Sequence, residues 1–550
     1  MQVLTAQQYA QRLMTSSYSD GITRTMRPGS DGAISVNLAD LTAQEKWLAR
    51  AAMQEIGDMT GLQFRETTGA AMITYSNDGS GASTRTAASG TTINSATVRI
   101  SSDRVGDSDG YGSFAFRTYM HETLHALGLG HPQDYGEIQD FSRSAIANDS
   151  WQISLMSYFD QDENSWVNAT KAYHLTPMLA DYLALTQMYG STPIHGWNTT
   201  YGVNSNAGGA LDAAASLGAG ATFLIVDTGG IDHVNFVGSS VAQKIDLTPG
   251  AISSVMGAVG NMQIAPGTQI EHATGGQAAD TLIGNAAGNR LTGNAGNDQI
   301  AAGDGADTVW GGAGDDFISG GGDADLLAGG SGHETIWAGA GADSVSGDAG
   351  FDLMGGGSGN DTVSGGLGND TIWGGLDHDN LDGGDGADVI GAGAGNDVVT
   401  GGQGSNTVYG ALGADRITAG EGHDLIFGGD GSDAIVAGGG DDTVWGGNGD
   451  DNIVGGAGGD RLAGGTGNDI LQGGGGADRF VFTSGFDAIR DFEAAADIIT
   501  LTSFAGLESW ADVQARLVQV QSHVEFRQDG HALRIETVQL ADLEADNFVW

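Results

Sequence analysis

The chain has 550 residues with 21 basic and 69 acidic side chains, a formal net charge of −48, 95 glycines and no cysteine. This charge disfavours nucleic acids and anionic membranes as partners, because both are polyanions. Without cysteine there can be no disulfide and no thiolate ligand, so a transition metal would have to be held by His, Asp, Glu or Tyr.

The N-terminal residues 1–20 have no basic region followed by an apolar stretch, so they do not resemble a Sec signal peptide. We interpret them as an N-terminal extension or a short pro-segment. Export from the cell would then need a signal other than a Sec signal peptide. No run of about 18 apolar residues occurs, so we expect no membrane insertion.

Residues 21–205 are predicted to form a mixed α and β globular domain. Apolar residues at helical spacing predict a helix over 41–62, with Gly61 as its stop. Partly alternating segments at 64–76 and 95–102 are typical of strands. We expect further helices over 116–127 and 177–190.

The segment HETLHALGLGH begins at His121. A helix would place His121 and His125 on one face, one turn apart, where two imidazoles can bind a single Zn²⁺. Glu122 would reach a metal-bound water. Gly128 can end the helix and turn the chain so that His131 becomes a third ligand. The alternative is a set of ordinary histidines that bind no metal.

A nine-residue repeat occupies residues 275–480. Its sixth position occurs 23 times from Asp280 to Asp478, and 20 of these residues are Asp. The residue two places later is apolar in all 23 units. This pattern predicts a parallel β-roll in which each coil contains two units and the apolar residue points inward. Roughly 11 coils about 50 Å long would follow.

So thin a core could not offset both the ordering of the glycines and the repulsion among stacked aspartates. Calcium would neutralise them, since Ca²⁺ prefers carboxylate and carbonyl oxygens. The alternative, a disordered low-complexity segment, is the expected state without calcium. The predicted calcium ligands are Asp298, Asp307, Asp316, Asp325, Asp343, Asp352, Asp361, Asp370, Asp379, Asp388, Asp397, Asp415, Asp424, Asp433, Asp442, Asp451, Asp460 and Asp469.

Several segments together resemble the serralysins, bacterial metzincin zinc metalloproteases that carry repeats-in-toxin (RTX) units of the form GGxGxDxUx. They are HALGLGHPQDYG, SLMSYF, LTPMLADYLALTQMYG, VDTGGIDHVNF and GADRFVF. The resemblance covers nearly the whole chain from about Gly21. It implies an α+β metzincin catalytic domain (21–205), a bridging β segment (206–274), an RTX parallel β-roll (275–480), and a C-terminal β cap with a secretion signal (481–550).

The resemblance also implies roles for single residues. His121, His125 and His131 would hold one catalytic Zn²⁺, and Glu122 would act as general base. Tyr158 would ligate zinc at rest and move away to stabilise the tetrahedral intermediate. Met156 would be an apolar floor beneath the histidines, although an ordinary core methionine is the alternative.

Two features depart from the serralysin pattern. Leu124 stands where these proteins usually have glycine, which should alter helix packing more than ligation. Only about twenty residues precede the apparent start of the domain. Latency would then depend on low calcium inside the cell, or the sequence is shortened.

The resemblance implies a secreted, calcium-stabilised zinc endopeptidase exported by type I secretion. Its partners would be protein or peptide substrates, the secretion apparatus and a proteinaceous inhibitor, and we expect a monomer. One alternative is a non-catalytic RTX surface or matrix protein with an inactive peptidase domain. An RTX toxin or lipase is the other, but it would need a membrane-inserting tract or a G-x-S-x-G elbow.

Overall fold

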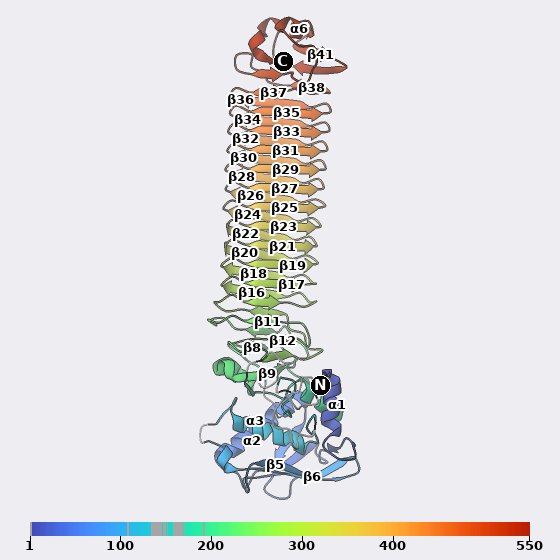
Figure 1. The fold of residues 1–550 in the computed structure, drawn as a ribbon, viewed down its shortest axis with the longest axis vertical. Coiled ribbons are helices and arrows are strands. Elements are labelled where there is room, and N and C mark those ends of the chain that lie inside the picture. Colours follow the sequence, from blue (N-terminus) through green and yellow to red (C-terminus); the bar gives the residue numbers. More distant parts are fainter. Residues whose placement is uncertain are drawn as a thin grey trace. The chain divides into compact units, whose positions relative to one another are not determined.

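The computed structural model describes residues 3–106, 109–133, 146, 150, 152–157, 169, 171–190 and 193–550. The chain divides into two compact units, Met1–Asn285 and Ala286–Trp550 (Figure 1). No helix in the described ranges is long and apolar enough to cross a membrane. The first unit is an α+β structure and the second contains a parallel β-roll, so the predicted fold class is confirmed.

The first unit has a mixed sheet in the order β1-β6-β4-β2-β3, and β5 pairs with β6. All pairings in it are parallel except the antiparallel pair of β5 and β6. The strands are β1 (Thr25–Met26), β2 (Ala33–Asn37), β3 (Gln63–Glu66), β4 (Ile73–Ser76), β5 (Ala82–Ser89) and β6 (Thr92–Ile100).

The helices of this unit are α1 (Ala6–Thr15), α2 (Ala43–Thr60), α3 (Phe114–Ala126), α4 (Leu179–Tyr189) and the short α5 (Ala214–Leu217). Three of them, α2, α3 and α4, lie close to the predicted ranges, whereas α1 and α5 were not predicted. Helix α2 ends at Gly61, whose φ of 74° is left-handed, as predicted. Helix α3 begins two residues before the predicted start, because the side chain of Ser113 caps it by accepting a hydrogen bond from the amide of Phe116. Helix α1 packs against α4.

Short strands form the rest of the first unit. One sheet has the order β12-β13-β9-β7, while β10 pairs with β8 and β14, and β11 pairs with β15. Their bounds are β7 (Tyr173–His174), β8 (Thr200–Gly202), β9 (Ala221–Ile225), β10 (His233–Asn235), β11 (Lys244–Asp246), β12 (Ile252–Ser253), β13 (Met262–Ile264), β14 (His272–Thr274) and β15 (Thr281–Ile283).

The roll of the second unit has two parallel sheets, which Figure 1 shows as stacked strands. One contains β16 (Arg290–Ala295), β18 (Thr308–Ala313), β20 (Leu326–Gly332), β22 (Ser344–Gly350), β24 (Thr362–Leu367), β26 (Asn380–Asp385), β28 (Val398–Gln403), β30 (Arg416–Glu421), β32 (Ala434–Gly439), β34 (Asn452–Ala457) and β36 (Ile470–Gly475). The other contains β17 (Gln299–Gly303), β19 (Phe317–Gly322), β21 (Thr335–Ala340), β23 (Leu353–Ser358), β25 (Thr371–Leu376), β27 (Val389–Ala394), β29 (Thr407–Leu412), β31 (Leu425–Asp430), β33 (Thr443–Asn448), β35 (Arg461–Thr466) and β37 (Arg479–Val481).

Each coil consists of two nonapeptides, as predicted. Strands pair with a shift of 18 residues, as in the pair of Val309 with Leu327. The apolar residue of each unit is buried between the two sheets. The turns require glycine: Gly312 has a φ of 122°, and a Cβ there would lie 2.0 Å from the carbonyl oxygen of Asn294 on the previous coil.

A cap follows the last coil. Its elements are β38 (Phe486–Ile489), β39 (Ile498–Thr500), α6 (Trp510–Gln514), β40 (Leu517–Val520), β41 (His523–Gln528), β42 (His531–Ile535) and β43 (Phe548–Val549). The aromatic rings of Phe482, Phe504 and Phe526 pack together inside it. Strands β38 and β39 continue the two sheets, so the cap covers edges that would otherwise remain open.

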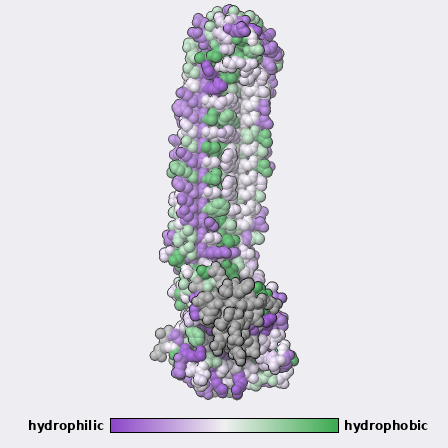
Figure 2. Space-filling model, viewed as in Figure 1, coloured by the Kyte–Doolittle hydropathy of each residue, from purple (hydrophilic) through white to green (hydrophobic). Residues whose placement is uncertain are grey.

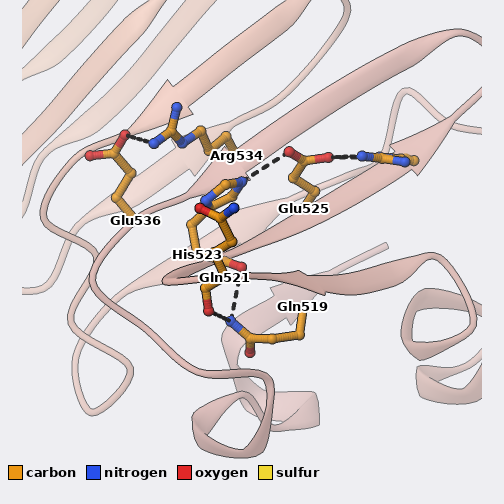
Figure 3. Close-up of polar contacts among 7 residues, drawn as sticks. Gln519, Gln521, His523, Glu525, Arg534 and Glu536 are labelled. Atoms are coloured by element: carbon orange, nitrogen blue, oxygen red, sulfur yellow. Dashed lines mark hydrogen bonds and ion pairs between the residues drawn. The ribbon is translucent and has the colours of Figure 1, made fainter.

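The outer surface of the cap carries a charged cluster on β41 and β42 (Figure 3). Glu525 lies 2.9 Å from Nε2 of His523 and also accepts hydrogen bonds from Arg527. These contacts lower the pKa of Glu525, with His523 as the larger cause. Arg534 pairs with Glu536 at 3.0 Å. Surface pairs of this kind contribute little to stability, so the phenylalanine core holds the cap together.

The inward position of the roll predicts a difference between neighbouring substitutions. Ile390 is fully buried, whereas Val389 is 37% exposed. We expect Ile390→Ala to lower the free energy of unfolding by about 2–5 kcal/mol, because it leaves a cavity. Val389→Ala should change it by no more than about 0.5 kcal/mol. Urea unfolding in saturating calcium measures both, and equal effects would contradict the assigned orientation.

Candidate metal centre

Helix α3 and the turn after it bring three histidines together. His121 and His125 lie one turn apart on α3, and the helix ends at Ala126. Gly128 has a φ of 106°, and a Cβ there would lie 2.3 Å from the carbonyl oxygen of Arg24. Only glycine fits this turn, which returns the chain so that His131 faces the other two imidazoles.

The three Nε2 atoms converge. Nε2 of His131 lies 2.9 Å from Nε2 of His125 and 3.3 Å from Nε2 of His121. Two of the rings are oriented from behind, because Nδ1 of His121 lies 3.0 Å from the carbonyl oxygen of Leu155 and Nδ1 of His125 lies 2.8 Å from that of Leu129. A carbonyl accepts only, so Nδ1 carries the proton in both rings and Nε2 presents its lone pair.

This donor set fits zinc. Within the described part of the chain, these residues form the one group of His, Cys, Asp or Glu whose ligand atoms, all within 4.8 Å of one another, could hold a metal ion. Burial lowers the pKa of His125 to about 4 and that of His131 to about 3, and it holds the pKa of His121 well below its usual value. The imidazoles are therefore neutral at pH 7, as ligation requires, and three neutral imidazoles leave one tetrahedral position open.

Glu122 lies beside this group and is held by β5. Its Oε2 accepts a 2.7 Å hydrogen bond from Oγ1 of Thr84. Burial raises the pKa of Glu122, and the bond from Thr84 opposes that rise. A cleft of about 700 Å³ and a hollow of about 350 Å³ both border Glu122. Both are also lined by His121 and by Ala82 of β5, so β5 contributes to the wall of the site.

A buried carboxylate on α4 organises the segment around Met156. Asp181 accepts hydrogen bonds from the hydroxyl of Ser154 and the amide of Leu155, each at 2.7 Å. The carbonyl of Leu155 in turn faces Nδ1 of His121. Met156 follows Leu155 and is fully buried, while Tyr158 lies outside the described residues. Asp181 thus links α4 to the orientation of the first histidine.

The repeated aspartates of the second unit share one geometry. Oδ1 of each accepts a hydrogen bond from the repeat residue 18 positions earlier, as Asp316 does from the amide of Asp298 at 2.8 Å. The second oxygen, Oδ2, is buried, and no hydrogen-bond donor reaches it. This is so in Asp307, Asp316, Asp325, Asp343, Asp352, Asp361, Asp370, Asp379, Asp388, Asp397, Asp415, Asp424, Asp433, Asp442, Asp451, Asp460 and Asp469.

A buried carboxylate oxygen without a donor is costly, and a hard cation removes that cost. Burial, followed by the charges of neighbouring carboxylates, raises the pKa of Asp379 and of Asp451 to about 7. Seventeen of the eighteen predicted ligand positions therefore have a carboxylate oxygen that a cation could bind, and Asp298 is the exception. Calcium is the hard cation that takes six to eight such ligands in flexible geometry.

One acidic cluster of the first unit escaped the sequence prediction. Oδ1 of Asp232 accepts from the amide of Thr199 at 2.7 Å, but its buried Oδ2 has no donor. Burial, then the charges of Asp227 and Glu271, raises the pKa of Asp232 to about 7. The signal was the DTGGID segment, in which two aspartates flank glycines with φ of 151° and 136°.

Comparison with known proteins gives two kinds of similarity. The model of the RTX calcium-binding nonapeptide repeat (4 copies) matches residues 274–309, 301–334, 319–354, 355–390, 391–426, 427–462 and 454–489. Among solved structures, the extracellular lipase LipA from Serratia marcescens aligns with a TM-score of 0.17 at 19% identity, over 35% of this chain and 40% of the lipase. A TM-score this low carries no argument.

The curated relatives are proteases. The chain is 39% identical over 199 residues to Metalloprotease AprA of Pseudomonas entomophila, covering 35% of this chain and 41% of that protein. It is 33% identical over 270 residues to Metallopeptidase AprA of Pseudomonas marginalis, with coverages of 46% and 56%. It is 36% identical over 266 residues to Serralysin of Photorhabdus luminescens, with coverages of 45% and 54%. The chain thus spans about half the length of these relatives.

The carboxyl pKa values predict how the calcium-free roll responds to pH. Asp379 and Asp451 have pKa values of about 7 in the folded roll, raised from 3.8. A carboxyl group whose pKa is higher in the folded than in the unfolded state contributes its full stabilisation at pH values below its pKa in the unfolded chain. This contribution is lost as the pH rises through its pKa in the folded roll. In chelator, we therefore expect the roll to be most stable near pH 4 and to lose stability up to pH about 7.

Thermal unfolding followed by circular dichroism, in chelator and in millimolar calcium, measures this dependence. Calcium should abolish the loss between pH 4 and 7, because it takes the place of the protons. A calcium-free roll that grows more stable over this interval would contradict the assigned carboxylate environment.

Proposed function

We propose that the chain is a member of the serralysin family and that it is a secreted zinc-dependent endopeptidase that hydrolyses extracellular proteins; the similarity to metalloproteases and the RTX repeats support the family assignment. The observation that carries the proposal is the convergence of three neutral imidazoles beside a buried glutamate on the wall of an open cleft. His121, His125 and His131 would hold the zinc. Bound zinc would polarise the scissile carbonyl and lower the pKa of the attacking water.

The residues of this chain supply the remaining steps. Glu122 accepts the proton of the attacking water at Oε1, because Oε2 is held by Thr84, and it then donates that proton to the leaving amine. In the described residues β5 pairs only with β6, so an extended substrate can lie against the open edge of β5. We assign to Tyr158 the stabilisation of the oxyanion by its phenol, and to Met156 the apolar floor.

Calcium has a separate part in the proposal. The predicted aspartates from Asp298 to Asp469 would bind several calcium ions. Since calcium binds only the folded roll, millimolar calcium outside the cell would drive folding, whereas submicromolar calcium inside would leave the chain extended for type I export.

Casein hydrolysis in millimolar calcium tests the catalytic proposal. Glu122→Gln should lower kcat by about 10²–10⁴-fold, the usual loss when a general base is removed, while the protein still binds one zinc. Zinc analysis of both proteins is the control. A wild type that binds zinc and cleaves no casein or unfolded peptide would instead favour the non-catalytic calcium-binding protein.

Thr84 provides a finer test of the positioning of Glu122. Thr84→Val removes the hydroxyl that holds Oε2 and should lower kcat roughly tenfold, which corresponds to one hydrogen bond of about 1.4 kcal/mol. KM and zinc content should stay unchanged, and Thr84→Ser, which keeps the hydroxyl, should restore most of the rate. Equal losses in the valine and serine variants would assign Thr84 a packing role only.

A further inference from the structure

One face of the roll carries a second periodicity, twice that of the coil. On the odd-numbered strands, a Thr-x-aromatic triplet recurs every 36 residues. The threonines are Thr335, Thr371, Thr407 and Thr443, and the aromatic residues are Trp337, Trp373, Tyr409 and Trp445. The middle residue of each triplet is buried, so both outer side chains point away from the core on the same strand.

The tryptophans lie over glycines. Gly355 pairs with Trp337 and Gly391 pairs with Trp373 on the following coil. A Cβ on Gly355 would lie 2.5 Å from Cε3 of Trp337, and one on Gly391 would lie 2.4 Å from Cε3 of Trp373. Each indole thus rests on the neighbouring backbone. Trp337 is 40% exposed and Trp373 is 45% exposed, so each presents a face to solvent.

The aromatic residues continue along the same sheet. Tyr409 lies two coils beyond Trp373, and Phe427 and Trp445 stack on it in turn with centroid distances of 5.1 and 4.7 Å. Because neighbouring strands are about 4.8 Å apart, the platforms of Trp337, Trp373 and Tyr409 recur about every 10 Å. Figure 2 shows columns of hydrophobic and hydrophilic residues running along the stacked coils. The hydrophobic column is not the row of tryptophans and tyrosine, because these residues are near neutral on the hydropathy scale. We call Trp337, Trp373, Tyr409, Phe427 and Trp445 the aromatic strip.

The strip is uncharged although the chain carries −48 charges. From β21 to β33, the first and third residues of the odd-numbered strands include no acidic and no basic side chain. The other sheet has a single such triplet, at Trp310, and Arg290 lies over that ring at 4.7 Å. That sheet also has Asp382 and Arg416 at outward positions.

On the sheet of the aromatic strip, Arg461 likewise lies over the ring of Trp445 at 6.0 Å, and Phe427 is covered on both faces by the stacked rings of Tyr409 and Trp445. The aromatic faces open to solvent are therefore those of Trp337, Trp373 and Tyr409, all on one sheet.

We propose that the aromatic strip binds a neutral, extended polysaccharide. The C–H bonds on the face of a sugar ring pack on the negative face of an aromatic ring, and the threonine beside each platform offers a hydroxyl to the sugar hydroxyls. A repeat of about 10 Å is a distance that one disaccharide of an extended chain can span. This inference concerns the second unit alone and does not depend on the peptidase activity.

The distribution of charge around the aromatic strip favours a neutral polysaccharide over other ligands. A polyanionic glycan or nucleic acid would be repelled by the carboxylates that stay exposed in the turns beside the calcium-binding aspartates, such as Asp377 and Asp385. A polycation would bind those turns rather than an uncharged strip. A second copy of the chain would bring two sets of acidic turns together. A neutral ligand meets none of these costs.

Affinity electrophoresis of the calcium-loaded full chain tests the proposal, with hydroxyethyl cellulose as a neutral β-linked glucan and polygalacturonate as its anionic counterpart. We expect the glucan, and not polygalacturonate, to retard the wild type. Trp337→Ala/Trp373→Ala should weaken binding at least tenfold. Trp310→Ala, on the other sheet, is the matched control and should bind like the wild type.

A second pair of variants keeps every aromatic residue. Gly355→Ala/Gly391→Ala would displace both indole rings from their packing on the neighbouring backbone, and it should also weaken binding at least tenfold. Circular dichroism in calcium shows whether the tryptophan variant folds. If it does not fold, the glycine variant tests the binding proposal in its place. A wild type that the glucan does not retard, or variants retarded equally, would overturn the proposal. So would a dimer in sedimentation that the tryptophan variant abolishes, since that assigns the strip to a second copy.

Discussion

Buried carboxylate oxygens that no donor reaches are the constraint on which the roll depends. Each repeat contributes one inward apolar residue and one aspartate, and Oδ1 of that aspartate is used to bind the amide of the coil before it. Oδ2 is then left in a turn made of glycine backbone, close to further carboxylates. Because the core is only one side chain thick, burial of apolar residues contributes little to the free energy of folding. Whether the buried carboxylates stabilise or destabilise the roll therefore decides between the folded and the extended chain. A bound cation would make them stabilising, and we therefore propose that this unit folds only when calcium is bound.

The candidate metal centre of the first unit depends on a different arrangement, in which backbone carbonyls fix the direction of two of the three imidazoles. The carbonyls of Leu155 and Leu129 leave Nε2 of His121 and His125 as acceptors, and Gly128 permits the turn that adds His131. Asp181 holds the segment of Leu155 through a hydroxyl and an amide. Such second contacts reduce the reorganisation needed when a metal binds. Glu122 is held in the same way by Thr84, whose hydroxyl donates to one of the two carboxylate oxygens.

Most of the roll could be predicted from the sequence, because a strict period fixes both the inward position and the aspartate of every coil. The grouping of the three histidines could be predicted as well, since they lie within eleven residues of one another in the sequence. The contacts that hold the side chains of this site in place could not be predicted from the sequence. Thr84 lies 38 residues before Glu122 on β5, whose small and polar residues give no strand signal and whose order comes from pairing with β6. Asp181 lies 26 residues after Leu155. The role of Tyr158 and the domain boundaries stay predictions.

Hydrogen exchange at the amides of the repeat aspartates, in the full chain at pH 7.5 with and without calcium, tests the central claim most directly. These amides donate to Oδ1 of the next coil, so they report on each coil in turn. The account predicts strong protection in millimolar calcium and exchange close to that of an unfolded chain in chelator, while amides of α2 keep their protection. Equal protection of the aspartate amides in chelator would contradict it, because the roll would then be stable with its carboxylates ionised and no cation bound.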